Sequence, residues 1–396
     1  MAARPVARFL SGTALVLTFG VALEITCRIE DRIANGIPLL SRVTQPGHLI
    51  LVDTGGARGR PNARFGQWRM NSMGFRGPEF TFSRRPGSLR VVVEGASETF
   101  GLYEAPGREF PRQLEDSLRQ RTAAMCGAPS TDAIEVINGA LPGMALPSMV
   151  RHVASVVTPL HPDVIVLYPS PGFYLDVQPP RATVGPTASD SSLPAANALR
   201  LRLVDRLRSQ VKSLTPEIVL TSLRRRSIEK VERQHPTSWK IRSVPEERVA
   251  LFERDLRRAV GAGRQTGARV ILLGHVNQTL FPDFNDAAAL VAWEKQFPNT
   301  TGETLADFHR RAREISVRVA RDSSVDLVDP TKALEGHWRD SFADFVHFTD
   351  LGAATIAGQL ASYLVAALPN TTLCRSSSVG GIETPPFSPL ASGVPW

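Results

Sequence analysis

The sequence predicts an α/β fold, an open parallel sheet of about five strands with helices on both faces and a basic helical insertion. Short β-branched runs alternate along the chain with longer segments of helical spacing, and this alternation is typical of a parallel sheet. The run at 164–168 is apolar throughout, as expected where both faces of a parallel sheet are covered. With 42% hydrophobic and 21% charged residues among 396, the chain has the composition of a folded protein with a sizeable core.

The predicted elements follow one another in a regular order after residue 88. Strands are expected at 89–93, 133–137, 164–168, 270–273 and 325–328. Helices are expected at 111–121, 149–157, 304–321 and 349–368. Ligand sites in such sheets lie beyond the carboxyl ends of the strands, so residues that follow these strands are the candidates for function.

The amino terminus has the pattern of an export signal. Arg4 and Arg8 precede an uncharged run at 9–23, and positive residues before an apolar run keep that end in the cytoplasm. We therefore expect an extracytoplasmic protein, periplasmic or on the cell surface, that meets the membrane through residues 9–26. An anchored terminus is favoured. A cleaved signal peptide, with secretion, and a buried helix of a cytosolic protein are the alternatives.

The chain divides by composition into successive segments. These are a signal anchor or signal peptide at 1–27, an irregular lead-in at 28–88, the main folded domain at 89–374 with its insertion at about 179–265, and a disordered Ser/Gly/Pro-rich tail at 375–396.

The positive charge of the chain is confined to one region. Residues 200–269 hold 18 Lys/Arg against 8 Asp/Glu, which leaves the rest of the chain near −2 from a total of +8. No recognition motif accompanies this charge, so nucleic acid is not expected as a partner. A solvated helical insertion is favoured over a surface for acidic polymers or anionic lipids.

The three cysteines are too few for a disulfide framework and have no zinc-ligand spacing. Outside the cytoplasm Cys126 and Cys374 are available to pair, because Cys27 lies beside the membrane segment; two unrelated thiols are the alternative. Neither a phosphate loop nor a metal-ligand cluster is found, and no cofactor is expected.

Two short segments carry the residues of a serine hydrolase. Ser97 follows the first predicted strand in a glycine-containing turn, where its hydroxyl is exposed and its N–H is suited to an oxyanion. A serine nucleophile needs a base that a third group orients. Asp344 and His347 supply both, since their spacing lets the carboxylate reach Nδ1 and leaves Nε2 for Ser97.

These segments resemble the SGNH or GDSL-type hydrolases. The motifs are Gly-x-Ser-x-Thr-x-Gly at 95–101, Asn138-Gly139 at the end of the second strand, and Asp-x-Val-His at 344–347 before a helix. Residues 71–77, Asn-Ser-Met-Gly-Phe-Arg-Gly, are similar to a lead-in of membrane-anchored bacterial members. The resemblance covers roughly residues 70–175 and 268–368. It implies a three-layer, flavodoxin-like fold, Ser97 as nucleophile, His347 as base and Asp344 as the orienting carboxylate.

The chain departs from that family pattern at three positions. Ala96 replaces the aspartate before the nucleophile, and Asn-x-Gly becomes Asn138-Gly139-Ala140. The expected oxyanion donors are therefore the backbone N–H groups of Ser97 and Ala140, with Gly139 beside them.

The third block, at 169–174, lacks the family's asparagine. Loss of one such donor costs about 100- to 1000-fold in turnover. Tyr174, His275 and Asn277 are candidate replacements, and Asn138 is a further pocket residue. Tyr174 as a pocket wall and His275 as a structural histidine are the alternatives.

Three functions follow from the resemblance and the expected compartment. The first is a serine esterase that removes acyl groups such as acetyl from an extracytoplasmic carbohydrate or another ester-bearing molecule. The second is an O-acyltransferase that uses the same triad on a polysaccharide. The third is a non-catalytic glycan-binding or scaffold protein that retains the fold.

Overall fold

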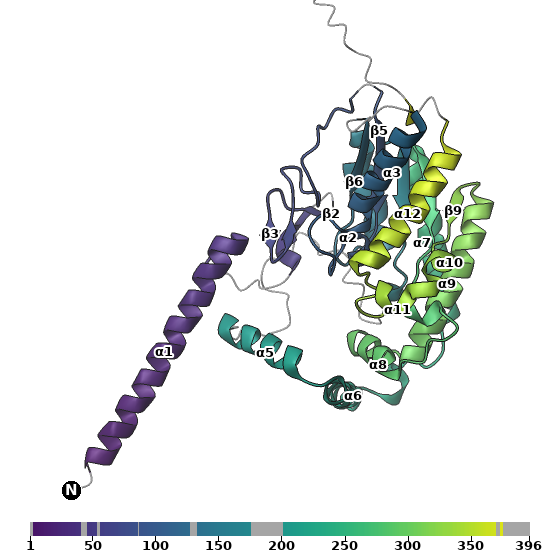
Figure 1. The fold of residues 1–396 in the computed structure, drawn as a ribbon. Helices are drawn as coiled ribbons and strands as arrows, with labels where there is room; N and C mark the ends of the chain where they lie inside the picture. Colours follow the sequence, from purple (N-terminus) through teal and green to yellow (C-terminus); the bar gives the residue numbers. More distant parts are fainter. Residues whose placement is uncertain are drawn as a thin grey trace, which may run out of the picture.

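A computed structural model describes residues 3–40, 46–53, 56–85, 87–126, 133–175, 201–369 and 373–374. Its centre is a five-stranded parallel sheet in the order β6-β5-β7-β8-β9 (Figure 1). The strands are β5 (Leu89–Glu94), β6 (Ile134–Asn138), β7 (Val164–Leu167), β8 (Arg269–Leu273) and β9 (Asp326–Val328). All five predicted strands are present, and the predicted α/β fold class is confirmed.

Helices cover both faces of the sheet. One face packs on α3 (Phe110–Cys126) and α12 (Asp350–Ala367), and the other on α4 (Leu146–His152), α7 (Glu246–Gln265) and α9 (Gly302–Asp322). Strand β5 shows why the predicted strands read as continuous apolar runs. Val91 and Val93 enter the core on the α3 and α12 side, while Val92 between them enters the opposite core.

The structure places the end of the predicted insertion in the core. Helix α7 falls within 179–265, yet Phe252, Leu256 and Val260 are buried against the sheet. It is the crossover helix that returns the chain from β7 to β8, as a parallel pair requires. Helix α5 (Arg202–Leu214) and helix α6 (Glu217–Glu232) precede it, and α8 (Ala287–Gln296) follows β8.

The lead-in predicted at 28–88 is partly built into the domain. It contains β1 (Ile50–Asp53) paired with β2 (Gly56–Gly59), and β3 (Arg64–Phe65) paired with β4 (Trp68–Arg69). Leu49, Met70 and Phe75 join the same core as α7 and α9. The segment therefore contributes buried apolar surface as well as connecting the amino terminus to the sheet.

Most of the amino-terminal helix α1 (Ala3–Asn35) stands away from the sheet domain (Figure 1). Its end reaches the lead-in, where the N–H of Gly66 donates to the side chain of Asn35. No helix in the described part of the chain is long and apolar enough to cross a membrane. The tail predicted at 375–396 lies outside the described residues.

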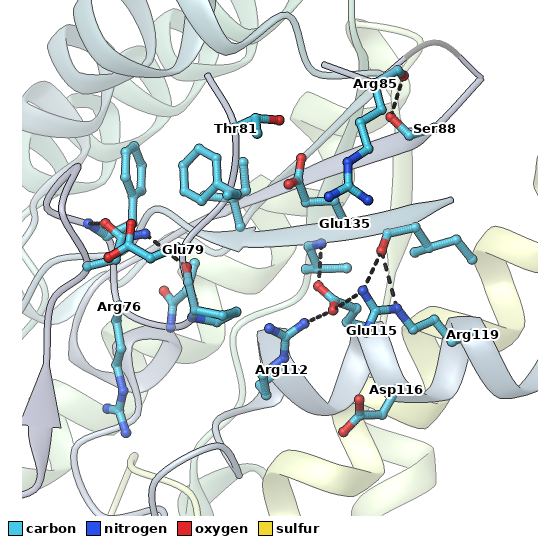
Figure 2. A pocket seen from close by; sticks show the side chains of 18 residues that line it. Arg76, Glu79, Thr81, Arg85, Ser88, Arg112, Glu115, Asp116, Arg119 and Glu135 are labelled. Atoms are coloured by element: carbon cyan, nitrogen blue, oxygen red, sulfur yellow. Dashed lines mark hydrogen bonds and ion pairs between the residues drawn. The ribbon is translucent and has the colours of Figure 1, made fainter. Parts of the chain in front are cut away.

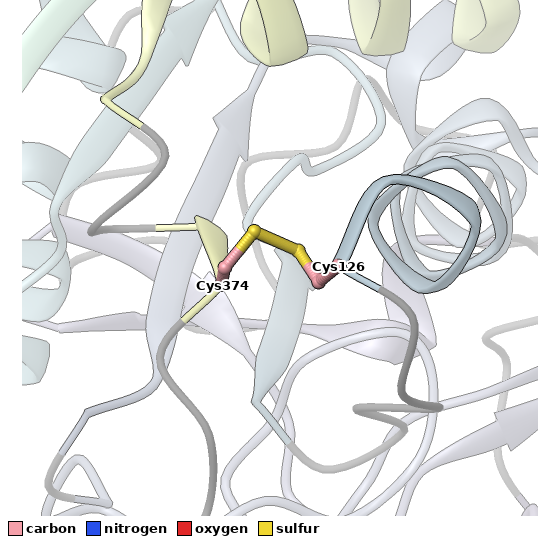
Figure 3. The surroundings of a disulfide bond; sticks show 2 residues. All are labelled: Cys126 and Cys374. Atoms are coloured by element: carbon pink, nitrogen blue, oxygen red, sulfur yellow. A yellow bond between two sulfur atoms is a disulfide. The ribbon is translucent and has the colours of Figure 1, made fainter.

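A disulfide joins Cys126 at the end of α3 to Cys374 beyond α12, 248 residues away in sequence (Figure 3). The sequence left open whether Cys126 and Cys374 pair or are unrelated thiols, and in the structure they form a disulfide. Cys27 is buried in α1 as a free thiol.

Candidate active site

The turn between β5 and the short helix α2 (Ser97–Phe100) presents Ser97 at the carboxyl edge of the sheet. Gly95 is needed for this turn, because a Cβ at that position would lie 2.1 Å from Oγ1 of Thr99. Ser97 begins α2 and is partly exposed, whereas Ala96 and Glu98 on either side are buried. A strand that stops at a close-packed glycine thus leaves the serine as the accessible residue of the turn.

Asp344 and His347 lie in the loop that precedes α12. The carboxylate of Asp344 accepts the Nδ1–H of His347 at 2.8 Å and also accepts the backbone N–H of His347 at 2.9 Å. An Nδ1–H donor fixes the tautomer of the neutral ring, so the lone pair is on Nε2. That Nε2 is buried and has no hydrogen-bond partner among the described residues.

The loop after α2 packs against the loop that carries His347. The ring of Tyr103 lies edge-on to His347, with 5.4 Å between the ring centroids. The N–H of Ala105 donates to the Asp350 carboxylate at 2.9 Å. The turn with the serine and the loop with the histidine are therefore held at the same edge of the sheet.

Ser97 does not bond to His347 in this structure. Its hydroxyl donates to Oε2 of Glu98 at 3.2 Å. A rotation about χ1 is a modest rearrangement for a serine, and catalytic hydrogen bonds are often unformed without substrate. The resting arrangement thus has an oriented imidazole and a serine that must turn towards it.

Glu98 is the centre of a buried cluster that the sequence did not reveal. Its Oε1 accepts the hydroxyl of Ser170 at 2.9 Å and lies 3.3 Å from Nε2 of His275. Burial opposes ionisation, but the hydrogen bond and charge of His275, with the charge of His347, lower the pKa of Glu98 to about 2. An ionised carboxylate only accepts hydrogen bonds, so Nε2 of His275 carries the proton between them.

Two features of the sequence could have indicated Glu98 and Ser170 as members of this cluster. Glu98 is an acidic residue inside an apolar strand-to-helix segment, directly after the candidate nucleophile. Ser170 stands in the third block, where the asparagine is missing. The contact of Glu98 with His275, 177 residues away, is a product of the tertiary fold.

The surroundings of His347 favour its charged form. Burial would lower the pKa of His347, but the hydrogen bond and charge of Asp344, with the charges of Glu98 and Glu104, raise it above the ordinary value. Burial would raise the pKa of Asp344, yet its bonds from His347 hold it below the usual value. This combination suits a base that becomes an imidazolium during a reaction.

The predicted backbone donors of the second block are engaged in the fold. The N–H of Gly139 donates to the carbonyl of Val93 at 2.9 Å, which closes the end of the sheet. The N–H of Ala140 donates to Oδ1 of Asn138 at 3.2 Å. By contrast, the N–H of Ser97 makes no hydrogen bond to any described residue.

Of the replacements predicted for the missing asparagine, only His275 is linked to the Ser97 turn, through its contact with Glu98. The hydroxyl of Tyr174 donates to the Asp255 carboxylate at 3.0 Å in the core between α7 and α9. Asn277 is fully buried, accepts the N–H of Thr279 and contacts Nδ1 of His309. Both side chains are thus occupied in holding the structure together.

A cavity of about 610 Å³ lies at the free edge of β6, away from Ser97 and His347 (Figure 2). Asn138 and Arg76 are part of its wall, but Ser97 and His347 are not. Figure 2 shows the carboxylate of Glu115 between Arg112 and Arg119. Because Glu115 also accepts the N–H of Val136, this cluster satisfies the outer edge of β6 and blocks it from pairing with another strand.

No group of three potential metal ligands occurs among the residues that the structure describes.

No family model matches the chain, and no curated protein matches it at a significant level. Loose similarity exists to solved structures. An α/β hydrolase from the metagenome of Lake Arreo, Spain, has 15% identity and a TM-score of 0.40, over 73% of this chain and 97% of that one. A lipase/acylhydrolase from Enterococcus faecalis also has 15% identity and a TM-score of 0.40, over 72% and 98%. A protein described as lipolytic and of the G-D-S-L family from Desulfitobacterium hafniense has 10% identity and a TM-score of 0.38, over 69% and 99%.

Proposed function

We propose that the chain is a serine esterase of the SGNH type, with Ser97 as nucleophile, His347 as general base and Asp344 as the carboxylate that orients it. The observation that carries the proposal is the Asp344–His347 pair. It presents an unpartnered, buried Nε2 at the sheet edge where Ser97 is partly exposed. A histidine with that orientation can take the proton of a serine hydroxyl as the serine attacks a carbonyl.

The proposed reaction has two steps. The hydroxyl of Ser97 turns from Glu98 to Nε2 of His347, loses its proton there and attacks the ester carbonyl, while the N–H of Ser97 donates to the oxyanion. The alcohol leaves with the proton from His347, and water then hydrolyses the acyl-serine by the same route. Ser170 lies in the block where the family has its asparagine, and both Ser170 and His275 are held on Glu98.

The proposed substrate is an ester on an extracytoplasmic glycan or a similar small molecule, and the proposed compartment is periplasmic or cell-surface. The Cys126–Cys374 disulfide supports an oxidising compartment, since such bonds are rare in the cytosol. Transfer of the acyl group to a sugar hydroxyl uses the same residues. The two reactions differ only in whether water or the sugar attacks the acyl-serine.

A non-catalytic function is the second candidate. The observation that favours it is that the N–H groups of Gly139 and Ala140, two of the expected oxyanion donors, bond within the fold. In addition, the hydroxyl of Ser97 bonds to Glu98 and not to His347. A carbohydrate-binding protein needs the shape of such a site but no oxyanion donors.

The test is labelling of the full chain with a fluorophosphonate, which reacts with activated serines. We expect Ser97 to be labelled, and Ser97→Ala and His347→Ala to abolish the labelling. Ser170→Ala is the matched control, because it removes a neighbouring hydroxyl and leaves the proposed nucleophile. An unlabelled but folded chain would favour the binding function.

Mass spectrometry of an acetylated glycan, incubated with the chain in the presence and absence of an acceptor sugar, then distinguishes hydrolysis from acyl transfer.

A further inference from the structure

The exposed apolar side chains of this protein are concentrated at one place. Of the 22 large apolar side chains exposed in the described part of the chain, 14 lie on α1, α5 and α6. Figure 1 shows α1 and α5 together at the side of the sheet domain, with α6 next to α5. Water-soluble surfaces seldom gather apolar side chains in this way unless something covers them.

Helix α5 carries a continuous apolar stripe. Val204, Leu207, Val211 and Leu214 recur at intervals of three and four residues, which places them along one side of the helix. Their exposure rises along the helix, from 37% at Val204 to 83% at Leu214. A helix of 13 residues is marginal in water on its own, so this stripe requires an apolar partner.

The other side of α5 is fixed to α1 by polar groups. The Glu24 carboxylate accepts the N–H groups of Arg202 and Leu203, which lie in the first turn of α5. Arg202 and Arg206 form ion pairs with Asp31, and Arg206 also pairs with Glu30. The acidic residues of α1 are therefore used to hold α5 in place with its apolar stripe uncovered.

Positive charge borders the stripe. Arg208 and Lys212, one turn apart and both exposed, lie along its edge, and α6 adds exposed Arg225 and Arg226. Residues 201–232 hold eight Lys/Arg against four Asp/Glu. A second copy of the chain would bring like charges together across a symmetric contact. An anionic bilayer attracts these charges and takes up the apolar residues.

We propose that α5, with the exposed apolar side chains of α1 from Leu15 to Ile33, binds the surface of an anionic phospholipid bilayer. The apolar stripe enters the boundary between headgroups and acyl chains, and Arg208 and Lys212 reach the headgroups. This surface would hold the sheet domain beside the membrane. The proposal is independent of the hydrolase chemistry.

The test compares two tryptophan probes in the full chain, reconstituted in vesicles of phosphatidylcholine with phosphatidylglycerol. Val211→Trp places a probe in the stripe, and Ser209→Trp places one on the opposite, exposed side of α5. The emission of the unsubstituted chain, which has five tryptophans, is subtracted. Brominated lipids should quench the Val211→Trp signal strongly and the Ser209→Trp signal little.

The electrostatic part is tested by lipid composition. Quenching at position 211 should weaken in pure phosphatidylcholine and at high salt. Arg208→Gln and Lys212→Gln should each lower the ratio of inserted to free α5 by about fivefold. Equal quenching of the two probes, or none at position 211, would overturn the proposal. A blue-shifted but unquenched Val211→Trp would also overturn it, because that result indicates a protein partner.

Discussion

At the scale of single residues, the candidate site contains two carboxylate–imidazole pairs. Asp344–His347 comes from one loop, and Glu98–His275 joins the α2 turn to the end of β8. The first pair orients the ring that would serve as the base for the proposed nucleophile, with its Nε2 unpartnered among the described residues. The second places a negative charge close enough to His347 to raise its pKa.

Glu98→Gln should therefore change the pH dependence of catalysis. The acid limb of kcat/KM reports the loss of a proton from His347. Removal of the Glu98 charge lowers the pKa of His347, so that limb should move to lower pH. The measurement is kcat/KM for an activated ester between pH 4 and 9.

Glu104→Gln is the control for this shift. Burial, only partly offset by backbone hydrogen bonds and the charge of Arg76, raises the pKa of Glu104 to about 8. Below that pH Glu104 is mostly protonated, so its charge acts on His347 only near and above pH 8. Its replacement should therefore leave the acid limb nearly in place. Equal shifts in the two variants would contradict the assignment of Glu98 as the charge that acts on His347.

The same buried carboxyl makes a prediction about stability. Because the folded-state pKa of Glu104 is about 8 and the ordinary value is 4.5, the folded protein binds a proton that the unfolded chain has lost between these values. The free energy of unfolding should fall as the pH rises through that window. Glu104→Gln should raise it by about 1–3 kcal/mol at pH 8 and have little effect at pH 4.5. Urea unfolding at the two pH values measures both, and equal effects would exclude this explanation.

At the scale of elements, a buried arginine holds the lead-in on the sheet. Arg90 in β5 is fully buried and donates to the carbonyls of Thr81, Phe82 and Leu160, and to the Glu135 carboxylate. A charged residue in the middle of a buried strand is tolerated only where its donors are satisfied.

Arg90→Met should lower the free energy of unfolding by about 2–4 kcal/mol, because it leaves buried carbonyls without donors. Arg339→Met is the matched control. Arg339 pairs with Asp283 at the surface, and such pairs contribute about 0–1 kcal/mol. Chemical denaturation compares the two; similar losses would show that the buried network adds nothing beyond a surface pair.

Some helices and strands could be predicted from the local sequence pattern alone. Strand β7 and helix α9 were predicted nearly to their ends, because apolar runs and three–four spacing are local signals. Helix α7 was assigned to the insertion because its arginines dominate the composition. That its apolar face is buried in the core became clear only from the position of the sheet on which it packs.

At the scale of the whole molecule, the chain is closed on itself by the disulfide. Helices α3 and α12 pack side by side, and the Cys126–Cys374 bond joins the ends of this pair across 248 residues. A bond that closes so long a loop reduces the freedom of the unfolded chain considerably.

Cys374→Ser should therefore lower the free energy of unfolding by about 2–5 kcal/mol. Reductant should destabilise the unsubstituted chain by a similar amount and have no effect on the variant. The double variant Cys126→Ser/Cys374→Ser should match the single one. Thermal unfolding with and without reductant is the measurement, and an unsubstituted chain insensitive to reductant would contradict the expected contribution.

The sequence alone determined the α/β class, the strand order along the chain, the position of Ser97 after the first strand, and the local pairing of Asp344 with His347. These features depend on residues close in sequence, where spacing fixes geometry. Only the tertiary structure decided that Gly139 and Ala140 use their N–H groups within the fold, that Tyr174 and Asn277 are structural, and that Glu98 gathers Ser170 and His275 beside Ser97. Apart from the local bonds of Ala140 to Asn138 and of Asn277 to Thr279, those contacts join segments tens to hundreds of residues apart. Which of them form depends on how the strands are ordered in the sheet.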